Sequence, residues 1–143
     1  MGPLDGYLPY LLNRAGARIA TAFNEEMRGL GTSLQDWRVL AALRERDGRR
    51  MGDLSVTTSI EVSTLTRLVD NMEQKALVAR RRDAEDSRAV LVHVTPAGRR
   101  LTRRILPIAE RYETVALKGF GAAEAESLRA ALRRLYANMD DLA

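Results

Sequence analysis

The stretch that decides the fold of this chain is STLTRLVDNMEQKALVARRRDAEDSRAVLVHVTPAGRRL, residues 63–101. In its first part, apolar residues recur at steps of three and four, a spacing that predicts a helix with one buried face. These residues are Leu65, Leu68, Val69 and Met72. The polar residues between them are therefore expected on the exposed faces of the same helix.

Beyond this helix the pattern changes to the alternation that is typical of strands. Residues 77–82 and 89–94 are short, β-prone segments, and they flank the sequence DAEDS. Together they predict a small β-hairpin. Thr95-Pro96 then predicts the start of another helix, because threonine caps helices and proline at the first helical position gives up only an amide that had no partner.

Helical periodicity continues upstream of this stretch. It predicts a long amphipathic helix over residues 8–30, a second helix from Ser33 to about Asp47, and a short helical piece over residues 51–56. A turn is expected at residues 57–59. The chain is therefore predicted to be mainly α with a small β-hairpin wing, which is the order of elements in a winged helix-turn-helix.

Three smaller signals complete this interpretation. Gly48-Arg49-Arg50 forms a basic link before residue 51, and Glu61 is placed to cap the helix that follows. GFG at 119–121 is expected to separate two C-terminal helices.

The terminal helices carry apolar stripes that are longer than a compact central unit can cover. This favours burial of the stripes across a two-fold axis in a homodimer. An intramolecular bundle of the terminal helices is the alternative.

The charge of the chain is concentrated in its middle third. The 143 residues include 23 Lys+Arg and 19 Asp+Glu, for a net charge of +4. Residues 1–60 carry a net +1, residues 61–104 a net +4 and residues 105–143 a net −1. A basic segment on an otherwise neutral scaffold indicates a surface that binds a polyanion, and a merely solvated basic face is the alternative.

Composition and motifs also exclude several classes of protein. With no cysteine and one histidine, His93, the chain has no disulfide framework, thiolate zinc site or cysteine-based peroxide sensor. It contains neither a glycine-rich phosphate loop nor a Gly-x-Ser-x-Gly elbow, so we expect no enzyme, cofactor or metal. No apolar run approaches the roughly 18 residues that span a bilayer, and the first residues lack the layout of a secretory signal, so we expect a cytoplasmic protein without a membrane partner.

Residues 63–101 resemble the MarR family of bacterial transcription regulators. The similar features are the recognition helix, the acidic-then-arginine wing motif and the helix start Thr95-Pro96-Ala97-Gly98, and DWRVLAAL at residues 36–43 also fits the family pattern. The resemblance covers nearly the whole chain. It implies a single MarR-type domain over residues 1–143, with a winged helix-turn-helix lobe at 33–104 and dimerisation helices at 1–31 and 105–143.

Three positions depart from the commonest sequence of this family, namely Ala76, Arg82 and Ser87. Ala76 stands where the family usually has glycine to close the recognition helix. Because alanine is strained in the left-handed conformation that such a position requires, we expect a cost of about 1 kcal/mol.

The polar faces of the predicted recognition helix carry residue types that read DNA. Arginine can bind the guanine O6/N7 edge with two hydrogen bonds, asparagine and glutamine can bind adenine, and hydroxyl side chains can meet bases or phosphates. The candidate DNA-binding residues of this helix are Ser63, Thr64, Thr66, Arg67, Asn71 and Gln74, and Asp70 lies among them. A solvated polar face is the alternative interpretation.

In the predicted wing, Arg82, Asp86 and Arg88 are the candidate DNA-binding residues. A carboxylate such as Asp86 can orient the guanidinium of Arg88 for insertion into the narrow minor groove of DNA. The resemblance implies the same arrangement. Alternatively, or in addition, Asp86 forms a salt bridge to Arg80. Arginines 99, 100, 103 and 104 are expected to be solvated rather than bound to DNA.

Members of the MarR family often respond to a small aromatic ligand, which the resemblance implies here as an effector. Tyr10, Arg14, Trp37 and Arg38 offer rings and guanidinium groups for an anionic aromatic compound. The sequence therefore predicts a homodimer that binds double-stranded DNA at a palindromic operator, most simply as a repressor. The competing hypothesis is a non-catalytic helical interaction module that binds acidic partners through the same basic segment.

Overall fold

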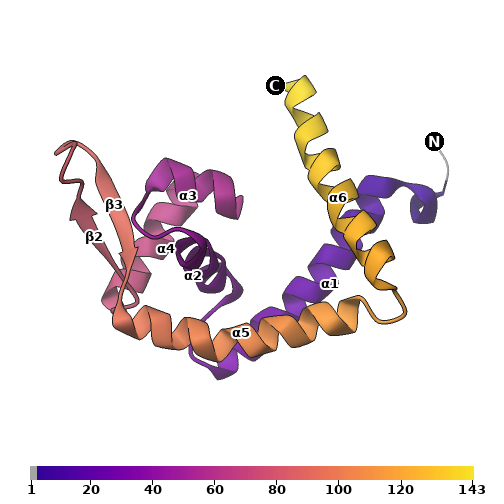
Figure 1. The fold of residues 1–143 in the computed structure, drawn as a ribbon, viewed down its shortest axis with the longest axis horizontal. Coiled ribbons are helices and arrows are strands. Elements are labelled where there is room, and N and C mark those ends of the chain that lie inside the picture. Colours follow the sequence, from indigo (N-terminus) through magenta and orange to yellow (C-terminus); the bar gives the residue numbers. More distant parts are fainter. Residues whose placement is uncertain (1–2) are drawn as a thin grey trace. The chain divides into compact units, whose positions relative to one another are not determined.

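The computed structural model describes residues 3–143. In chain order the elements are the short 3-10 helix η1 (Leu4–Gly6), α1 (Leu8–Gly29), α2 (Leu34–Glu45), β1 (Arg49–Arg50), α3 (Met51–Thr58), α4 (Val62–Gln74), β2 (Val78–Arg82), β3 (Val90–Val94), α5 (Pro96–Ala116), α6 (Ala122–Asn138) and the 3-10 helix η2 (Met139–Leu142) (Figure 1). They form two compact units, of which the first ends at Ala109 and the second comprises Glu110–Ala143. The predicted mainly helical fold with a small wing is confirmed.

The corner between α1 and α2 forms where the sequence predicted it. Gly31 has a φ of 73°, a left-handed conformation that favours glycine. Its amide donates to the Arg28 carbonyl at 3.0 Å, and the Thr32 amide donates to the Met27 carbonyl at 3.0 Å. The Ser33 hydroxyl then accepts the Asp36 amide at 3.0 Å, which caps the first turn of α2.

The hydrophobic core of the first unit lies between α2, α3, α4 and the sheet. The predicted stripe of α4 is confirmed, since Leu65, Val69 and Met72 are fully buried and Leu68 packs against them. Other core residues are Val39, Leu40, Leu43, Leu54, Ile60, Val78 and Val92. Burial of one face of α4 against this core fixes which of its faces remains exposed.

The wing is part of a three-stranded antiparallel sheet, with strand order β1-β3-β2. The predicted hairpin is confirmed as β2 and β3, in which Arg80 lies opposite Val92. The interpretation of residues 48–50 as a mere link is wrong, because Arg49 and Arg50 form β1 and pair with β3. The Arg49 guanidinium is buried and donates to the Ala42 carbonyl at 3.1 Å and to the Thr57 hydroxyl, which holds this short strand in place.

The turn before α4 differs in detail from the prediction. Thr57 and Thr58 still belong to α3, and the chain turns at Ser59, whose φ is 58°. Glu61 is the N-cap residue of α4 as predicted, but its carboxylate makes no cap hydrogen bond and instead accepts from the Ser63 hydroxyl at 3.3 Å. The short side chains of Ser, Thr, Asp and Asn are the ones that suit N-capping, and glutamate is longer.

The end of α4 shows the conformation expected at Ala76. This residue has a φ of 61°, and the following amide, that of Leu77, donates back to the Met72 carbonyl at 2.9 Å. The Thr95 hydroxyl donates to the Ala76 carbonyl at 2.6 Å, which ties the helix end to the start of α5. Alanine therefore occupies a position that favours glycine.

No helix in residues 3–143 is long and apolar enough to cross a membrane. Within the same residues, no cluster of three or more histidine, aspartate or glutamate side chains is arranged to hold a metal ion.

Replacing Ala76 by glycine is expected to stabilise the protein. Glycine removes the Cβ strain of a left-handed residue, so Ala76→Gly should raise the free energy of unfolding by about 1 kcal/mol. Denaturant unfolding at fixed protein concentration measures it. Ala41→Gly, within the right-handed interior of α2, is the matched control and should lower the same quantity by about 1 kcal/mol. A loss of stability in both variants would contradict the assignment of strain to Ala76.

Candidate nucleic-acid interface

The exposed faces of α4 carry the polar side chains that the sequence predicted. Ser63, Thr64, Thr66, Arg67, Asn71 and Gln74 are all exposed. The Thr66 hydroxyl donates to the Val62 carbonyl at 2.8 Å, so its proton is already used within the helix. The other side of the helix is buried in the core, and these residues therefore share the surface that a partner can reach.

Four of these residues form one row along α4. Thr64, Arg67, Asn71 and Gln74 are spaced by three, four and three positions, which places them on one side of a helix. Their side chains make no hydrogen bond or ion pair with any other residue in the range 3–143. Donors and acceptors with no internal partner are free to bind base edges, as direct readout in a major groove requires.

Asp70, which lies among these residues, has a different role. Its carboxylate lies 2.8 Å from Nη1 of Arg80 on β2, and Glu73 also pairs with that guanidinium. The Arg80 backbone amide donates to Glu73 at 3.2 Å, and Arg80 Nη2 donates to the Thr66 carbonyl at 3.4 Å. Arg80 thus fastens the wing to the side of α4, and this fixes the wing relative to the exposed row.

The tip of the wing holds exposed arginines around a loop closed by hydrogen bonds. Arg82 and Arg88 are both exposed, and Arg82 Nη1 donates to the Ser87 carbonyl at 2.6 Å. The Asp86 carboxylate accepts the backbone amide of Arg88 at 3.1 Å. The Arg88 guanidinium makes no contact of this kind within residues 3–143, so it is available to a partner.

Asp86 contacts Arg88 as predicted, but not through the predicted group, and the alternative salt bridge to Arg80 is wrong. Its carboxylate holds the Arg88 amide rather than the guanidinium, and it lies 3.7 Å from Nη2 of Arg50 on β1. Arg80, the alternative partner, pairs with α4 instead. Arg80 lies opposite Val92 in the sheet, away from the loop at the wing tip, whereas β1 brings Arg50 toward that loop. Asp86 therefore shapes the loop that presents Arg88.

The residues predicted for an aromatic effector do not gather in one site. Arg14 lies over the Tyr10 ring, with its guanidinium carbon 5.7 Å from the ring centroid. Trp37 packs near Phe23 at 6.5 Å between centroids, and Arg38 donates to a neighbour on its own helix. Since Tyr10 precedes Phe23 by more than three turns of α1, the rise of that helix separates them by about 20 Å. Trp37 and Arg38 together line one cavity, of about 350 Å³.

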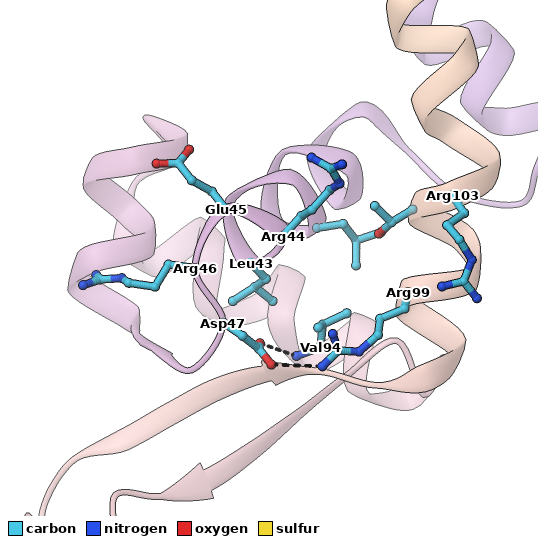
Figure 2. Close-up of a pocket in the computed structure, with 10 residues that line it drawn as sticks. Leu43, Arg44, Glu45, Arg46, Asp47, Val94, Arg99 and Arg103 are labelled. Atoms are coloured by element: carbon cyan, nitrogen blue, oxygen red, sulfur yellow. Dashed lines mark hydrogen bonds and ion pairs between the residues drawn. The ribbon is translucent and has the colours of Figure 1, made fainter.

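A second cleft, of about 280 Å³, lies between α2 and α5 and is drawn in Figure 2. Asp47 accepts the Val94 amide at 2.9 Å and pairs with Arg99 at 3.4 Å. Arg44 and Arg103 also line this cleft and have no ion-pair partner within residues 3–143. Its charged lining therefore mixes acids with bases, and part of it is already neutralised.

Sequence reasoning missed an ion pair between Lys75, at the C-terminal end of α4, and a buried carboxylate of α2. Lys75 Nζ lies 3.1 Å from Oδ2 of Asp36, whose side chain is only 2% exposed. The Thr32 hydroxyl donates to the same carboxylate at 2.9 Å. Asp36 lies in the first turn of α2, where an acidic side chain is already favourable because of the helix dipole. Its position in the sequence therefore gave no sign that it pairs with Lys75.

Comparison with known proteins gives one consistent family. Residues 30–89 match the sequence model described as MarR family. The chain is 24% identical over 133 residues to the HTH-type transcriptional repressor IacR of Pseudomonas putida, covering 93% of this chain and 80% of that protein.

Solved structures show the same similarity over a greater length. A transcriptional regulator of the MarR family from Silicibacter pomeroyi is 34% identical, with a TM-score of 0.86 over 96% of this chain and 92% of that one. BpsR of Bordetella bronchiseptica, whose DNA binding is regulated by 6-hydroxynicotinic acid, is 28% identical, with a TM-score of 0.85 over 94% of this chain and 98% of that one.

Proposed function

The chain belongs to the MarR family of transcriptional regulators, and from this premise we propose that it is a homodimeric repressor that binds a palindromic operator. The observation that carries the proposal is the row of unpartnered side chains on α4, held beside an arginine-tipped wing by Arg80. The row enters the major groove, where Arg67, Asn71 and Gln74 read base edges. Arg88 enters the adjacent minor groove, whose negative potential attracts a guanidinium.

Homodimerisation is supported by apolar side chains that each compact unit leaves exposed. In α1 they are Leu8, Leu11, Leu12 and Ile19, and in the second unit they are Leu128, Leu132, Tyr136, Met139 and Leu142. Exposed apolar surface on this scale marks a protein interface. We assign residues 1–31 and 105–143 to dimerisation and residues 33–104 to DNA binding. A dyad would then place the two α4 helices about one turn of DNA apart.

Two relatives support a proposal of repression that a small molecule releases. IacR is named a repressor, and the DNA binding of BpsR is regulated by an aromatic acid. We propose the same mode of action here, in which the effector binds a state of the dimer whose α4 helices no longer match the two half-sites. DNA and effector then compete through the conformation of the protein.

Arg88→Ala tests the role of the wing. Loss of the minor-groove contact should weaken binding to a selected duplex about tenfold or more at fixed salt, while binding to a scrambled duplex changes less. Fluorescence anisotropy with both duplexes measures the two affinities. Arg134→Ala is the control for the lost charge, because Arg134 is exposed on α6 and outside its apolar stripe. Equal affinities of Arg88→Ala and the unaltered protein for the selected duplex would remove the wing from the mechanism.

Leu132→Asp tests the dimer interface. The proposed dimer buries the apolar stripe that contains Leu132, and a carboxylate buried there costs several kcal/mol. The variant should therefore dissociate to monomers at concentrations where the unaltered chain is dimeric. Sedimentation equilibrium gives the mass of both proteins. Ser127→Asp, on an exposed position next to the stripe, should leave the dimer intact. A monomeric unaltered chain, or a Leu132→Asp variant that stays dimeric, would rule out this interface.

A further inference from the structure

The first turn of α4 leaves an apolar side chain outside the core. Val62 is the first residue of this helix and is 48% exposed, whereas the buried stripe of the helix begins at Leu65. Valine is branched at Cβ and is a weaker helix former than alanine or leucine. Neither core packing nor helix propensity therefore accounts for a valine at this position, which points to a partner outside the chain.

The two hydroxyl side chains nearest to Val62 in the sequence have already committed their protons. The Ser63 hydroxyl donates to the Glu61 carboxylate at 3.3 Å, and the Thr66 hydroxyl donates to the Val62 carbonyl at 2.8 Å. Thr66 is exposed and four positions from Val62, so the two side chains lie on one side of the helix. Thr66 can still offer its methyl group there. The start of α4 thus presents a small apolar surface, formed by Val62 and the methyl group of Thr66.

This apolar surface adjoins the polar row of α4. Thr64, the first residue of the row, lies between Val62 and Thr66 in the sequence, and Arg67 directly follows Thr66. The N-terminal residues of a recognition helix are the ones that contact base edges in the major groove. In that groove thymine presents a methyl group, which the other three bases lack and which apolar side chains contact. An apolar surface at this end of the helix therefore matches thymine.

A hydrogen bond from the wing holds this part of α4 in place. Arg80 Nη2 on β2 donates to the Thr66 carbonyl at 3.4 Å, and the Thr66 side chain is in turn bonded to the Val62 carbonyl. These contacts connect the wing to the first turn of the helix. Because its hydrogen bond fixes the rotamer of Thr66, the methyl group of this residue needs no reordering when a partner binds.

We propose that Val62, with the methyl group of Thr66 beside it, reads the 5-methyl group of one thymine in each half-site of the operator. The inference rests on the function proposed above, to which it adds a base preference that uses no hydrogen bond. Removing one methyl group from water corresponds to about a fourfold gain in affinity per half-site. The hydrogen-bonding side chains of the polar row then read the neighbouring base pairs.

Replacement of thymine by 2′-deoxyuridine tests the proposal, because it removes the 5-methyl group and keeps the base pair. The probe is a duplex recovered by selection from a random pool, in which each symmetry-related pair of thymines is replaced in turn. For the full chain, replacement of one such pair should lower the affinity about tenfold, and replacement of the other pairs by less than about threefold. Fluorescence anisotropy at fixed salt measures these affinities.

The variant Val62→Ala assigns the sensitive thymine to this side chain. Because alanine is too short to cover the methyl group, the same replacement should change the affinity of the variant by less than about threefold. Val56→Ala is the matched control, since Val56 is an equally simple exposed valine on the neighbouring helix α3, and it should keep the tenfold effect. The readout is a ratio of two affinities of one protein, so a change in folded fraction cancels.

Three results would overturn the inference and leave the proposed function standing. The first is a duplex that is preferred over a scrambled one and tolerates every deoxyuridine replacement. The second is an undiminished tenfold effect in Val62→Ala, and the third is an equal loss of the effect in Val56→Ala. Failure to prefer any duplex would instead overturn the function proposed above.

Discussion

The recognition helix α4 has one free surface because its other side is committed to the core. Leu65, Val69 and Met72 are fully buried, so rotation of the helix about its axis would expose apolar surface to water. Burial of these side chains therefore fixes the direction in which the polar row faces. The proposed base reading by α4 and the proposed role of the wing both depend on that fixed direction.

Ion pairs then attach the C-terminal half of α4 to two neighbouring elements. Arg80 joins the wing to the side of α4 through Asp70 and Glu73, and Lys75 joins the end of α4 to Asp36. The two attachments differ in what surrounds them. Both acids that pair with Arg80 lie on α4, whereas the acid that pairs with Lys75 lies on α2 and is buried.

Much of the fold and of the candidate site was predictable because the signals are local. The spacing of apolar residues gives α4 with its buried stripe and exposed row, and alternation gives the hairpin. Strand β1 was not predictable, because a strand of two residues is too short to show the alternation of apolar and polar residues. Its partners in β3, Leu91 and Val92, are also far away in the sequence. Ion-pair partners were not predictable either, because Asp36 and Lys75 are 39 positions apart and Asp86 meets Arg50 only through the three-stranded sheet. Carboxylates and arginines are numerous in this chain, and the sequence alone does not determine which of them pair.

Selection of bound duplexes from a random pool tests the central claim most directly, because the operator sequence need not be known beforehand. If two α4 helices present their polar rows to one face of DNA, the recovered sequences should converge on two inverted half-sites with centres about 10 base pairs apart. Recovery of no common sequence, or of a single half-site without a dyad, would contradict the account.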